Sequence, residues 1–379
     1  MRIMHIGLAS HYTEGMLYQD NILPDMNIRA GHKVIFITDT YMYVDGALKK
    51  TKEEDTILHN GVRLVRLEYD HILCQFVTNK IQKVHKLKKY LNDFGPDSIM
   101  YHGVCGYELM DVADYVRDHP NVLFYVDSHE DFNNTARNWI AKFSYKYIHG
   151  IFVKKAISHI RKILYLAESS REYLKDMYHI ADKQLEFYPL GGIITSIEEQ
   201  HQCREKVIRE LGLRKDVVIC SHSGKLDPLK RTKELIKAFR RVNNDKLVLL
   251  IFGFIPPDQE EELMGMIRSD SRVLFLGWKT GDEITELLNA TDVYCQPGSV
   301  SATSQVALCC GCAEIVAPIK SYEMMYDDAV MYGETVDEIK EHLFQIAEEG
   351  EYLEKYKEKG YKKAKEILDY SKLAERYLK

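Results

Sequence analysis

The chain has 379 residues, of which 45% are apolar and 28% are charged, and this length suits two globular domains. That apolar fraction excludes disorder over most of the chain, and a formal net charge of −6 argues against a nucleic-acid-binding protein. Residues 1–195 contain equal numbers of acidic and basic side chains, so the negative charge lies in residues 196–379. An acidic ligand must therefore be bound by a local cluster of basic side chains.

Short apolar runs alternate with amphipathic segments along the first half of the chain. The runs predict strands over residues 2–9, 33–38, 62–69, 98–102, 122–126, 163–167 and 185–188. The amphipathic segments predict helices over residues 15–30, 79–92, 107–118 and 170–178. Apolar strands separated by helices predict a parallel sheet that helices cover on both faces.

The second half repeats this alternation. Strands are expected over 217–221, 247–253, 273–276, 292–296, 314–317 and 329–332, with helices such as 233–242 and 282–288. The breaker Gly191-Gly192 and the polar stretch after it indicate a linker. The predicted fold is α/β, with two doubly wound Rossmann-like domains over 1–195 and 196–365 that face a cleft. Residues 366–379 form a helix that could return to the first domain.

The eight cysteines predict reduced thiols rather than disulfides, because a disulfide scaffold is unusual in a chain of this size and spacing. No second CxxC pair and no nearby histidine completes a ligand set around Cys309-Cys310-Gly311-Cys312, so this cluster does not predict a metal centre. The first residues lack the apolar core of a signal peptide, and no run approaches the ~20 apolar residues of a membrane span. A cytoplasmic location is expected.

The loops that follow strands hold the candidate functional residues of the first domain. The first strand runs into a loop without a GxGxxG fingerprint, so it does not predict a dinucleotide site. Gly15, at the expected start of a helix, could let a phosphate approach backbone N–H groups, or could be an ordinary loop glycine.

A second loop, Asp127-Ser128-His129-Glu130-Asp131, is the most polar strand exit in this domain. His129 beside carboxylates could act as a general base or position an acceptor hydroxyl. Asp127, His129 and Asp131 alternate, so they could share one face of an extended segment and bind a metal ion. A histidine with a purely structural role is the simpler alternative.

Residues 132–167 contain no acidic residue, and their aromatic and aliphatic side chains are interleaved with seven basic ones. The basic residues are Arg137, Lys142, Lys146, Lys154, Lys155, Arg161 and Lys162, and a second cluster comprises Lys80, Lys83, Lys86, Lys88 and Lys89. Such stretches are typical of surfaces that contact an anionic membrane, but also of the solvated faces of ordinary helices.

Two loops of the second domain suit an anionic ligand. Gly224 and Lys225 follow the first strand, and Lys230 precedes a helix, so they could bind a diphosphate. Ser301, Thr303 and Ser304 precede a helical segment, where hydroxyl side chains cap the helix or complete an anion site with its free N–H groups.

These residues resemble those of the retaining GT-B glycosyltransferases of family 4 (glycosyltransferase group 1), of the bacterial surface-polysaccharide kind. The segment from Ser223 to Arg231 is similar to that family's G-R-L-x-x-x-K-G loop, with Lys225 for Arg, Lys230 matching the Lys, and Arg231 for Gly. Further matches are Phe252-Gly253, Phe275-Leu276-Gly277, Ala290-Thr291-Asp292-Val293, Pro297-Gly298 and Cys310-Gly311, so the resemblance covers nearly the whole chain.

One departure concerns the family's Glu-x7-Glu pair. Val306 stands where the second Glu is expected and Gly298 near the first, while Gln305 is adjacent and could hydrogen-bond instead. The departure leaves a second hypothesis open, namely a non-catalytic sugar-nucleotide-binding partner of a glycosyltransferase complex. A metal hydrolase built on Asp127, His129 and Asp131 and a sugar-nucleotide epimerase are further alternatives.

The resemblance implies transfer of a sugar from a UDP- or GDP-sugar to a hydroxyl of a lipid-linked or polysaccharide precursor, with retention. It implies no metal and no cofactor, since the nucleotide sugar is a substrate, and no nucleic-acid partner. His129, Lys225 and Lys230 are the predicted catalytic residues, and Gly15, His129 and Asp131 the predicted acceptor-binding residues. The predicted donor-binding residues are Gly224, Lys225, Lys230, Gly253, Phe254, Trp278, Ser301, Thr303, Ser304 and Gln305. An acceptor bound to lipid would place the protein on the inner face of the cell membrane as a peripheral protein.

Overall fold

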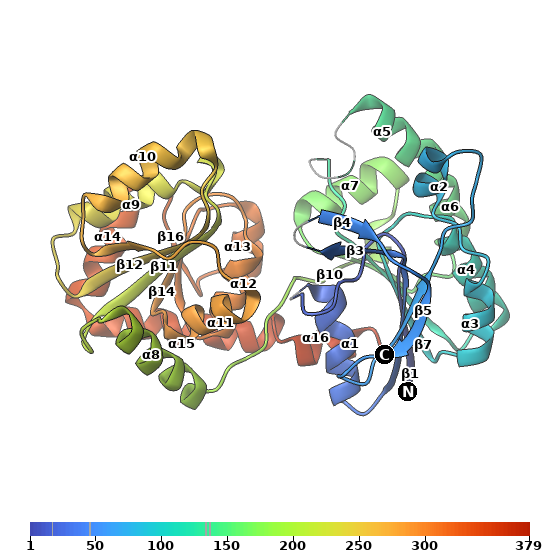
Figure 1. The fold of residues 1–379 in the computed structure, drawn as a ribbon, viewed down its shortest axis with the longest axis horizontal. Coiled ribbons are helices and arrows are strands. Elements are labelled where there is room, and N and C mark those ends of the chain that lie inside the picture. The colour runs from blue at the N-terminus through green and yellow to red at the C-terminus, as the bar shows by residue number, and fades with distance from the viewer. Residues whose placement is uncertain (17, 45–46, 133–134, 136–137) are drawn as a thin grey trace. The chain divides into compact units, whose positions relative to one another are not determined.

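The computed structural model describes all residues of the chain except 17, 45–46, 133–134 and 136–137. The chain folds into two compact units (Figure 1). Unit 1 comprises Met1–Pro189 and Tyr370–Lys379, and unit 2 comprises Leu190–Asp369. Each unit is an α/β sandwich whose central sheet positions the loops that carry the candidate site.

Unit 1 contains an eight-stranded sheet with the strand order β10-β9-β8-β7-β1-β2-β6-β5. Its paired strands are parallel, except that β5 is antiparallel to β6. The strands are β1 (Arg2–Gly7), β2 (Lys33–Asp39), β5 (Glu54–Ile57), β6 (Arg63–Leu67), β7 (Ser98–His102), β8 (Leu123–Ser128), β9 (Lys162–Tyr165) and β10 (Leu185–Phe187). A separate antiparallel hairpin joins β3 (Tyr41–Val44) to β4 (Ala47–Lys50).

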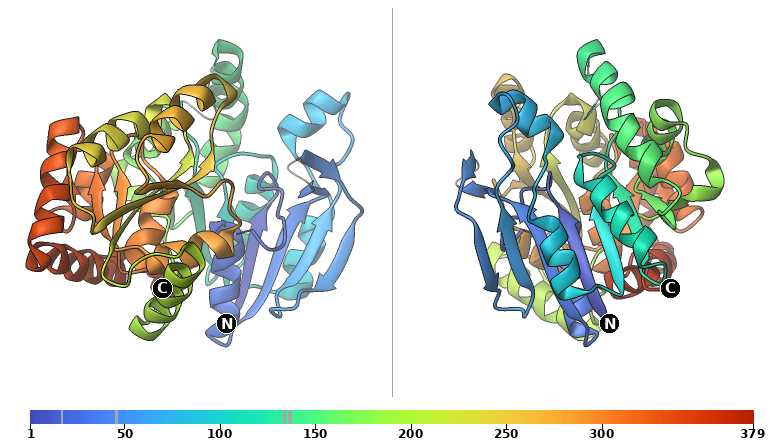
Figure 2. Two further views of the ribbon diagram at one scale, coloured as in Figure 1. Left: turned by 60° about the vertical axis from the view of Figure 1, so that its left-hand side comes forward. Right: turned by 90° about the vertical axis from the view of Figure 1, so that its right-hand side faces the viewer.

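Helices cover both faces of this sheet, which Figure 2 shows from two sides. One face packs on α3 (Leu87–Phe94), α4 (Glu108–Asp118), α6 (Gly150–Ala156) and α7 (Glu168–Tyr178). The other packs on α1 (Gln19–Arg29) and α16 (Tyr370–Arg376). The remaining helical segments are α2 (Gln75–Ile81), α5 (Trp139–Phe143), the π-helix η1 (Ser144–His149) and the 3₁₀-helix η2 (Asp182–Gln184).

Unit 2 contains a six-stranded parallel sheet with the order β13-β12-β11-β14-β15-β16. The strands are β11 (Val218–Lys225), β12 (Leu247–Phe254), β13 (Val273–Phe275), β14 (Val293–Gln296), β15 (Ala313–Val316) and β16 (Met331–Tyr332). One face packs on α9 (Thr232–Arg241), α10 (Pro257–Arg268), α14 (Val336–Glu348) and α15 (Gly350–Ile367), and the other on α8 (Ile197–Leu211), α11 (Gly281–Ala290) and α12 (Ala302–Cys309). The 3₁₀-helix η3 (Pro228–Lys230) and α13 (Lys320–Tyr326) complete the unit.

The last segment of the chain is anchored in unit 1. Ser98 Oγ donates a hydrogen bond to the carbonyl oxygen of Tyr377 at 2.8 Å, and Tyr188 Oη donates to that of Leu373 at 2.8 Å. The apolar side of α16 is buried against α1. Contacts of this kind fix α16 to the sheet through both polar and apolar groups.

Three predicted elements differ from the structure at places that matter for the site. The helix predicted over 15–30 begins only at Gln19, because Gly15 has φ +82° and Tyr18 is extended. The helix predicted over 79–92 is broken at Gln82, which adopts a left-handed conformation. The first strand of unit 2 continues to Lys225, because polar residues beyond the predicted end at 221 are buried and hydrogen-bonded, as in the 2.9 Å contact of Ser223 Oγ with Tyr294 Oη.

The predicted all-parallel sheet is wrong at its edge. β5 is exposed along its whole length and antiparallel, so it lacks the apolar run that marks a buried strand. No described helix is both long and apolar enough to cross a membrane.

Candidate functional site

The carboxyl edge of the unit 2 sheet begins with two glycines that face each other across β11 and β12. Gly224 is the register partner of Gly253, and Lys225 that of Phe254. Gly224 has φ +122° and Gly253 has φ +133°, both in the region that favours glycine. A Cβ atom on Gly253 would lie 2.0 Å from the carbonyl oxygen of Gly224. Only glycine therefore allows the two strand ends to approach this closely.

Lys230 places a buried amine beside this pair. It ends η3, whose start is capped by Asp227 Oδ1 accepting a hydrogen bond from the Leu229 N–H at 3.1 Å. The Lys230 Nζ atom would lie 3.5 Å from a Cβ atom on Gly224, so the missing side chain leaves room for it. Burial lowers the Lys230 pKa to about 8, although the Asp227 carboxylate acts in the opposite direction. Lys225, in contrast, is exposed.

The loop after β14 packs directly on η3. The Ser299 N–H donates to the carbonyl oxygen of Leu229 at 2.9 Å, and a Cβ atom on Gly298 would lie 2.1 Å from that oxygen. Since Lys230 follows Leu229, this contact brings Lys230 and the segment leading into α12 to the same edge. Two of the predicted anion-binding segments are thus brought together by backbone packing.

The predicted hydroxyl residues at the start of α12 have different environments. Ser301 is the N-cap residue but its side chain makes no capping hydrogen bond, and Thr303 is half-buried. Ser304 is fully buried, and its Oγ donates to Glu314 Oε2 at 2.8 Å. Burial raises the pKa of Glu314 well above its usual value, although the hydrogen bond from Ser304 acts in the opposite direction. Ser304 therefore contributes to an interior network rather than to an open surface.

Gln305 carries an unused hydrogen-bond acceptor. Gln305 is buried, and its Oε1 atom has no hydrogen-bond partner among the residues that the structure describes. A buried amide oxygen without a partner is unfavourable, so a ligand hydroxyl would improve its environment. The next residue, Val306, packs with the apolar cluster between the sheet and α8, α11 and α12. The residue at the position expected for a Glu therefore packs against the apolar core and offers no polar group to a ligand.

Arg231 occupies the other position that departs from the family pattern. It has φ +56°, a conformation that favours glycine, and its side chain forms an ion pair with Glu334. The backbone geometry expected for a Gly at this position is therefore kept, and the ion pair holds the side chain.

Two predicted aromatic residues lie exposed at the ends of neighbouring strands. Phe254, at the end of β12, is 47% exposed, and Trp278, after β13, is 75% exposed. The Gly253 N–H donates to the carbonyl oxygen of Gly277 at 2.8 Å, which ties the Trp278 loop to the end of β12. The edge thus combines basic groups, close-packed backbone and exposed aromatic rings.

In unit 1, His129 follows the end of β8 above a buried carboxylate. Asp127 is fully buried, and its Oδ1 accepts a hydrogen bond from the Gly103 N–H at 3.0 Å. The His129 Nε2 atom lies 3.9 Å from this Oδ1, and the His129 side chain is half-exposed. The prediction that His129 occupies a polar strand exit agrees with this geometry, whereas its role stays a prediction.

A buried chain of side chains supports Asp127 from inside. His102 Nδ1 donates to Asp127 Oδ2 at 2.6 Å, its Nε2 lies 3.1 Å from His5 Nδ1, and His5 Nε2 lies 3.0 Å from Asn27 Oδ1. Burial opposes protonation of His102, but Asp20 and Asp127 together raise its pKa to about 9. Burial and the His102 charge lower the pKa of His5 to about 3. His102 is therefore an imidazolium that donates on both sides, and His5 is neutral.

The geometry of this chain also bears on metal binding. Within the described part of the protein, Asp20, His102 and Asp127 are the group with ligand atoms close enough to surround an ion. His102 Nδ1 lies 3.3 Å from Asp20 and donates to Asp127. His129 and Asp131 do not belong to this group, so the metal hydrolase at Asp127, His129 and Asp131 gains no support from it and stays a hypothesis.

The other first-domain predictions have mixed outcomes. Gly15 is exposed and precedes α1 by four residues, so its N–H is not at a helix N-terminus as expected. Asp131 is half-buried. Arg137, one of the predicted basic residues, lies outside the described residues.

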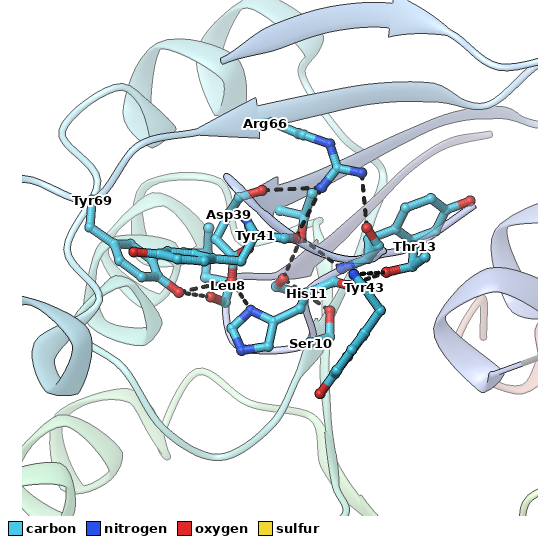
Figure 3. A network of polar contacts seen from close by, with 12 residues as sticks. Leu8, Ser10, His11, Thr13, Asp39, Tyr41, Tyr43, Arg66 and Tyr69 are labelled. Carbon is cyan, nitrogen blue, oxygen red and sulfur yellow. Dashed lines mark hydrogen bonds and ion pairs between the residues drawn. The ribbon is translucent and has the colours of Figure 1, made fainter. Parts of the chain in front are cut away.

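Sequence reasoning missed one pair, His11 and Asp39, which Figure 3 shows in a network of polar contacts. His11 Nδ1 lies 2.7 Å from Asp39 Oδ2. β1 and β2 are adjacent parallel strands with Gly7 opposite Thr38, so the residues after each strand meet. This adjacency was available as a signal, because His11 and Asp39 follow the two predicted strands.

Residues 204–363, within unit 2, match the family model described as Glycosyl transferases group 1. No curated protein sequence matches the chain. Sucrose-phosphate synthase from Thermosynechococcus elongatus is similar in structure, with 15% identity and a TM-score of 0.66 over 98% of this chain and 96% of that one. HepE from Anabaena, in complex with UDP, has 13% identity and a TM-score of 0.66 over 99% and 98%. WaaG, a glycosyltransferase involved in lipopolysaccharide biosynthesis, has 13% identity and a TM-score of 0.60 over 98% and 98%.

These similarities show the fold of the protein and support one class of enzyme. The fold is the GT-B fold of glycosyltransferases, which confirms the prediction of two doubly wound α/β domains. The match within unit 2 and the fold together support a group 1 glycosyltransferase.

Proposed function

We propose that the chain is a retaining glycosyltransferase that moves a sugar from a nucleoside diphosphate sugar to a hydroxyl of a lipid-linked or polysaccharide precursor. The observation that carries this proposal is the environment of Lys230 beside Gly224. A partly desolvated ammonium group is stabilised when an anion approaches it. A diphosphate that gains charge as the sugar leaves is such an anion, so binding strengthens as the reaction proceeds.

The donor is proposed to be a UDP- or GDP-sugar. HepE, a structural neighbour, has been solved with UDP and with UDP-glucose, which supports a nucleotide sugar as the ligand of this fold. In the proposed site Lys225 and Lys230 bind the diphosphate, close to the backbone of Gly224 and Gly253. Phe254 and Trp278 offer exposed rings for an apolar part of the donor. Ser301, Thr303 and Gln305 lie at the start of α12, whereas Ser304 supports this segment from the interior.

The acceptor is proposed to bind unit 1, near His129. The half-exposed His129 ring follows a strand whose last residues are held by the buried chain of Asp127, His102 and His5. A rigid support of this kind lets an imidazole hold a hydroxyl in one orientation, which is a large part of catalysis of group transfer. Asp131 and Gly15 remain proposed acceptor contacts.

The donor proposal is tested by thermal unfolding of the purified protein with UDP, GDP, ADP, dTDP and CMP, each with and without EDTA. A ligand that binds the folded state at a hundred times its dissociation constant stabilises it by about 2.7 kcal/mol. We expect one diphosphate to raise the melting temperature, independently of EDTA. The Lys230→Ala variant should lose the shift. Lys206→Ala removes an exposed lysine of α8 that pairs with Glu286 on α11, and it should keep the shift.

The two functional hypotheses separate on turnover. The non-catalytic hypothesis is not favoured by the family match and the fold. It requires a nucleotide-dependent shift without release of nucleoside diphosphate from any nucleotide sugar. Release of the diphosphate from the sugar whose nucleotide gave the shift would exclude it, and absence of both signals would contradict the glycosyltransferase proposal.

We further propose that unit 1 contacts an anionic membrane surface as a peripheral protein on the inner face of the cell membrane. Figure 1 shows α5 at the end of the unit, where it runs through η1 into α6. Its exposed apolar side chains and lysines form what we call the aromatic–lysine surface: Trp139, Phe143, Tyr147, Ile148, Ile151, Lys142, Lys146, Lys154 and Lys155. Exposed aromatic rings between lysines suit the interface of an anionic bilayer.

The second lysine cluster has a different character. Lys86 pairs with Glu53, and Lys88 lies 2.9 Å from Asp111. These partners neutralise two of the five lysines, so this cluster suits a solvated protein face better than a membrane. The side chain of Lys80 lies outside the described residues.

Co-sedimentation with phosphatidylcholine vesicles, with and without phosphatidylglycerol, tests the membrane proposal. We expect binding only when phosphatidylglycerol is present, and loss of binding in the double variant Phe143→Ser, Tyr147→Ser. The control Ile57→Ser removes another exposed apolar residue of unit 1 and should bind as the wild type does. Equal sedimentation of all three proteins would contradict the proposal.

A further inference from the structure

We infer that His11 and Asp39 form a second acceptor-binding element of unit 1, in which the His11 Nε2 atom accepts a hydrogen bond from a hydroxyl of a glycoside. The inference rests on the proposed function for its meaning in sugar transfer. Its basis is the geometry of the network in Figure 3. The pair lies where the loops after β1 and β2 meet, at the carboxyl edge of the sheet.

Asp39 fixes the His11 ring. Asp39 is fully buried, and its Oδ2 accepts from His11 Nδ1 at 2.7 Å. The Tyr69 hydroxyl lies 2.9 Å from the same Oδ2 and shares its one proton between Asp39 and the carbonyl oxygen of Leu8. Asp39 Oδ1 accepts from the Tyr41 N–H at 2.7 Å. The proton of a neutral His11 is therefore on Nδ1, and Nε2 carries the free lone pair. Figure 3 shows the Nε2 side of the ring turned away from Asp39.

The backbone around the pair is held by a buried arginine. Arg66 is almost completely buried, and its guanidinium donates to the carbonyl oxygens of Asp39 at 3.4 Å, Tyr41 at 3.3 Å and Tyr12 at 2.9 Å. These carbonyls flank His11 and Asp39 in the chain. His11 itself has φ +52°, which an L-residue adopts only when its surroundings enforce it. The surrounding hydrogen bonds thus hold the His11 backbone in a less favourable conformation, and this conformation fixes the position of the His11 ring.

The remaining hydrogen bonds leave Asp39 no other role than to orient its neighbours. Burial and the Asp39 charge raise the pKa of Tyr69, so its hydroxyl stays protonated and acts as a donor. The His11 side chain is 26% exposed while Asp39 is inaccessible, so only the imidazole can meet a ligand. The pair therefore consists of a partly exposed hydrogen-bond acceptor, His11 Nε2, held in place by the buried carboxylate of Asp39.

The aromatic neighbours indicate the class of ligand. The Tyr41 ring lies 5.8 Å from the His11 ring at an angle of 66°, and Tyr43 on the same short strand is exposed. Thr13 Oγ1 accepts from the Tyr43 N–H at 2.9 Å and donates to the His11 carbonyl oxygen at 3.0 Å, which couples the hairpin to the His11 loop. A hydroxyl acceptor beside tyrosine rings suits a sugar, whose C–H face packs on an aromatic ring.

The test uses three probes, namely methyl β-D-glucopyranoside, methyl β-D-galactopyranoside and methyl α-D-mannopyranoside. Binding to the full-length protein is measured by saturation-transfer NMR titration, and the state of His11 by long-range ¹H–¹⁵N spectra of the imidazole. We expect at least one glycoside to bind and to shift the His11 Nε2 resonance. His11→Ala should weaken its binding about tenfold, the size expected for loss of one hydrogen bond.

Two further variants distinguish binding from a structural effect. His11→Gln keeps an acceptor oxygen near the Nε2 position, so it should recover part of the affinity. His59→Ala removes another histidine of unit 1 that pairs with a carboxylate, Glu14, but both partners of that pair are on the surface, and its affinity should be unchanged. If all the variants bind as the wild type does, or if no probe binds the wild type, the inference is overturned.

The nucleotide experiment above keeps the two proposals apart. His11→Ala should keep the full diphosphate-dependent rise in melting temperature, since the diphosphate binds unit 2. A protein that binds glycosides through His11 but shows no shift with any nucleotide would refute the glycosyltransferase proposal alone. A nucleotide shift without any glycoside binding would refute the His11 inference alone. A loss of the nucleotide shift in His11→Ala would show a structural role for His11 and would also overturn the inference.

Discussion

The carboxyl edges of the two sheets are built from the same topology but from opposite chemistry. In unit 2 the edge consists of glycine backbone, exposed aromatic rings and a lysine whose pKa burial lowers. In unit 1 it consists of histidines supported by buried carboxylates. At the first edge Lys230 forms no ion pair among the described residues and Asp227 offsets its burial only in part, whereas the charges of the second edge are paired internally. The difference supports the proposals that unit 2 binds an anion and that unit 1 binds hydroxyl groups.

The largest loss of stability is expected when the buried ion pair between His102 and Asp127 in unit 1 is broken. His102→Gln would leave Asp127 buried without its imidazolium partner, and breaking such a pair costs about 3–5 kcal/mol of unfolding free energy. Urea denaturation of the wild type and the variant measures this loss. The exposed His59→Ala serves as the control and should change stability by less than about 0.5 kcal/mol.

The pH dependence of the same comparison has a defined sign. The His102 pKa is raised to about 9 in the folded protein, above the ordinary value of 6.5. Its stabilising contribution is therefore complete below about pH 6.5 and is lost as the pH rises through 9. The difference in stability between wild type and His102→Gln should shrink over this window. A difference that stays constant from pH 6.5 to 9 would contradict the imidazolium assignment.

The second prediction concerns the backbone approach in unit 2. Gly253→Ala places a Cβ atom 2.0 Å from a carbonyl oxygen and strains φ +133°, so the strand ends must separate. We expect a loss of about 2–4 kcal/mol in unfolding free energy and no nucleotide-dependent shift. Gly265→Ala is the matched control, because Gly265 lies inside α10 with open space around its Cβ position. It should stabilise the protein by about 0.5–1 kcal/mol.

The third prediction sharpens the contrast between a compensated and an uncompensated edge. Lys230→Met removes a partly buried amine, so the protein without ligand should gain about 1–2 kcal/mol of stability. The same variant should lose about 1.5–3 kcal/mol of affinity for the diphosphate that stabilises the wild type. Titration calorimetry and urea denaturation measure the two quantities. A variant that is less stable than the wild type would assign Lys230 to the fold rather than to a ligand.

The Lys230 pKa also predicts a pH effect. Because the folded pKa of about 8 lies below the ordinary 10.5, the unfolded chain binds a proton between these values that the folded protein does not. Wild-type stability should therefore rise with pH relative to Lys230→Met from pH 8 to 10.5. The opposite slope would show that the amine is stabilised, not desolvated, in the folded state.

The sequence predicted those helices and strands whose buried residues form a run or a periodic pattern of apolar side chains. The strand expected over 98–102 is β7, Ser98–His102, because every residue in it is buried. β5 and the hairpin of β3 and β4 were missed, because they are largely exposed and their stability comes from pairing at the sheet edge and from ion pairs such as Arg63 with Asp55. Apolar periodicity carries no information on such strands.

The candidate site shows the same limit. Gly224, Lys225 and Lys230 could be placed from the sequence, since they stand beside a strand end in a recognisable order. The pairing of His11 with Asp39 depends on the register of β1 against β2. The role of Ser304 depends on Glu314, a buried acid on another strand that the pattern does not distinguish from an exposed one. The sequence therefore predicted the helices and strands better than it predicted the contacts between them.

The smallest effect is expected at Gln305. Its Oε1 atom has no hydrogen-bond partner among the described residues, so it is a neutral counterpart of the Lys230 amine, which has no ion pair there. If a donor hydroxyl binds this oxygen, Gln305→Ala should weaken binding of the nucleotide sugar by about 1 kcal/mol, close to fivefold. If that hydroxyl belongs to the transferred sugar, the affinity for the free nucleoside diphosphate should not change, because this ligand keeps its ribose but lacks the transferred sugar. Gln202→Ala, at an exposed position of α8, is the control and should leave both affinities unchanged. An equal loss of affinity for the nucleotide sugar and the nucleoside diphosphate would place Gln305 beside the part that the two ligands share, the ribose or the phosphates. No loss of either affinity would show that the Gln305 amide does not contact the donor, and Lys230 alone would then carry the proposed anion site.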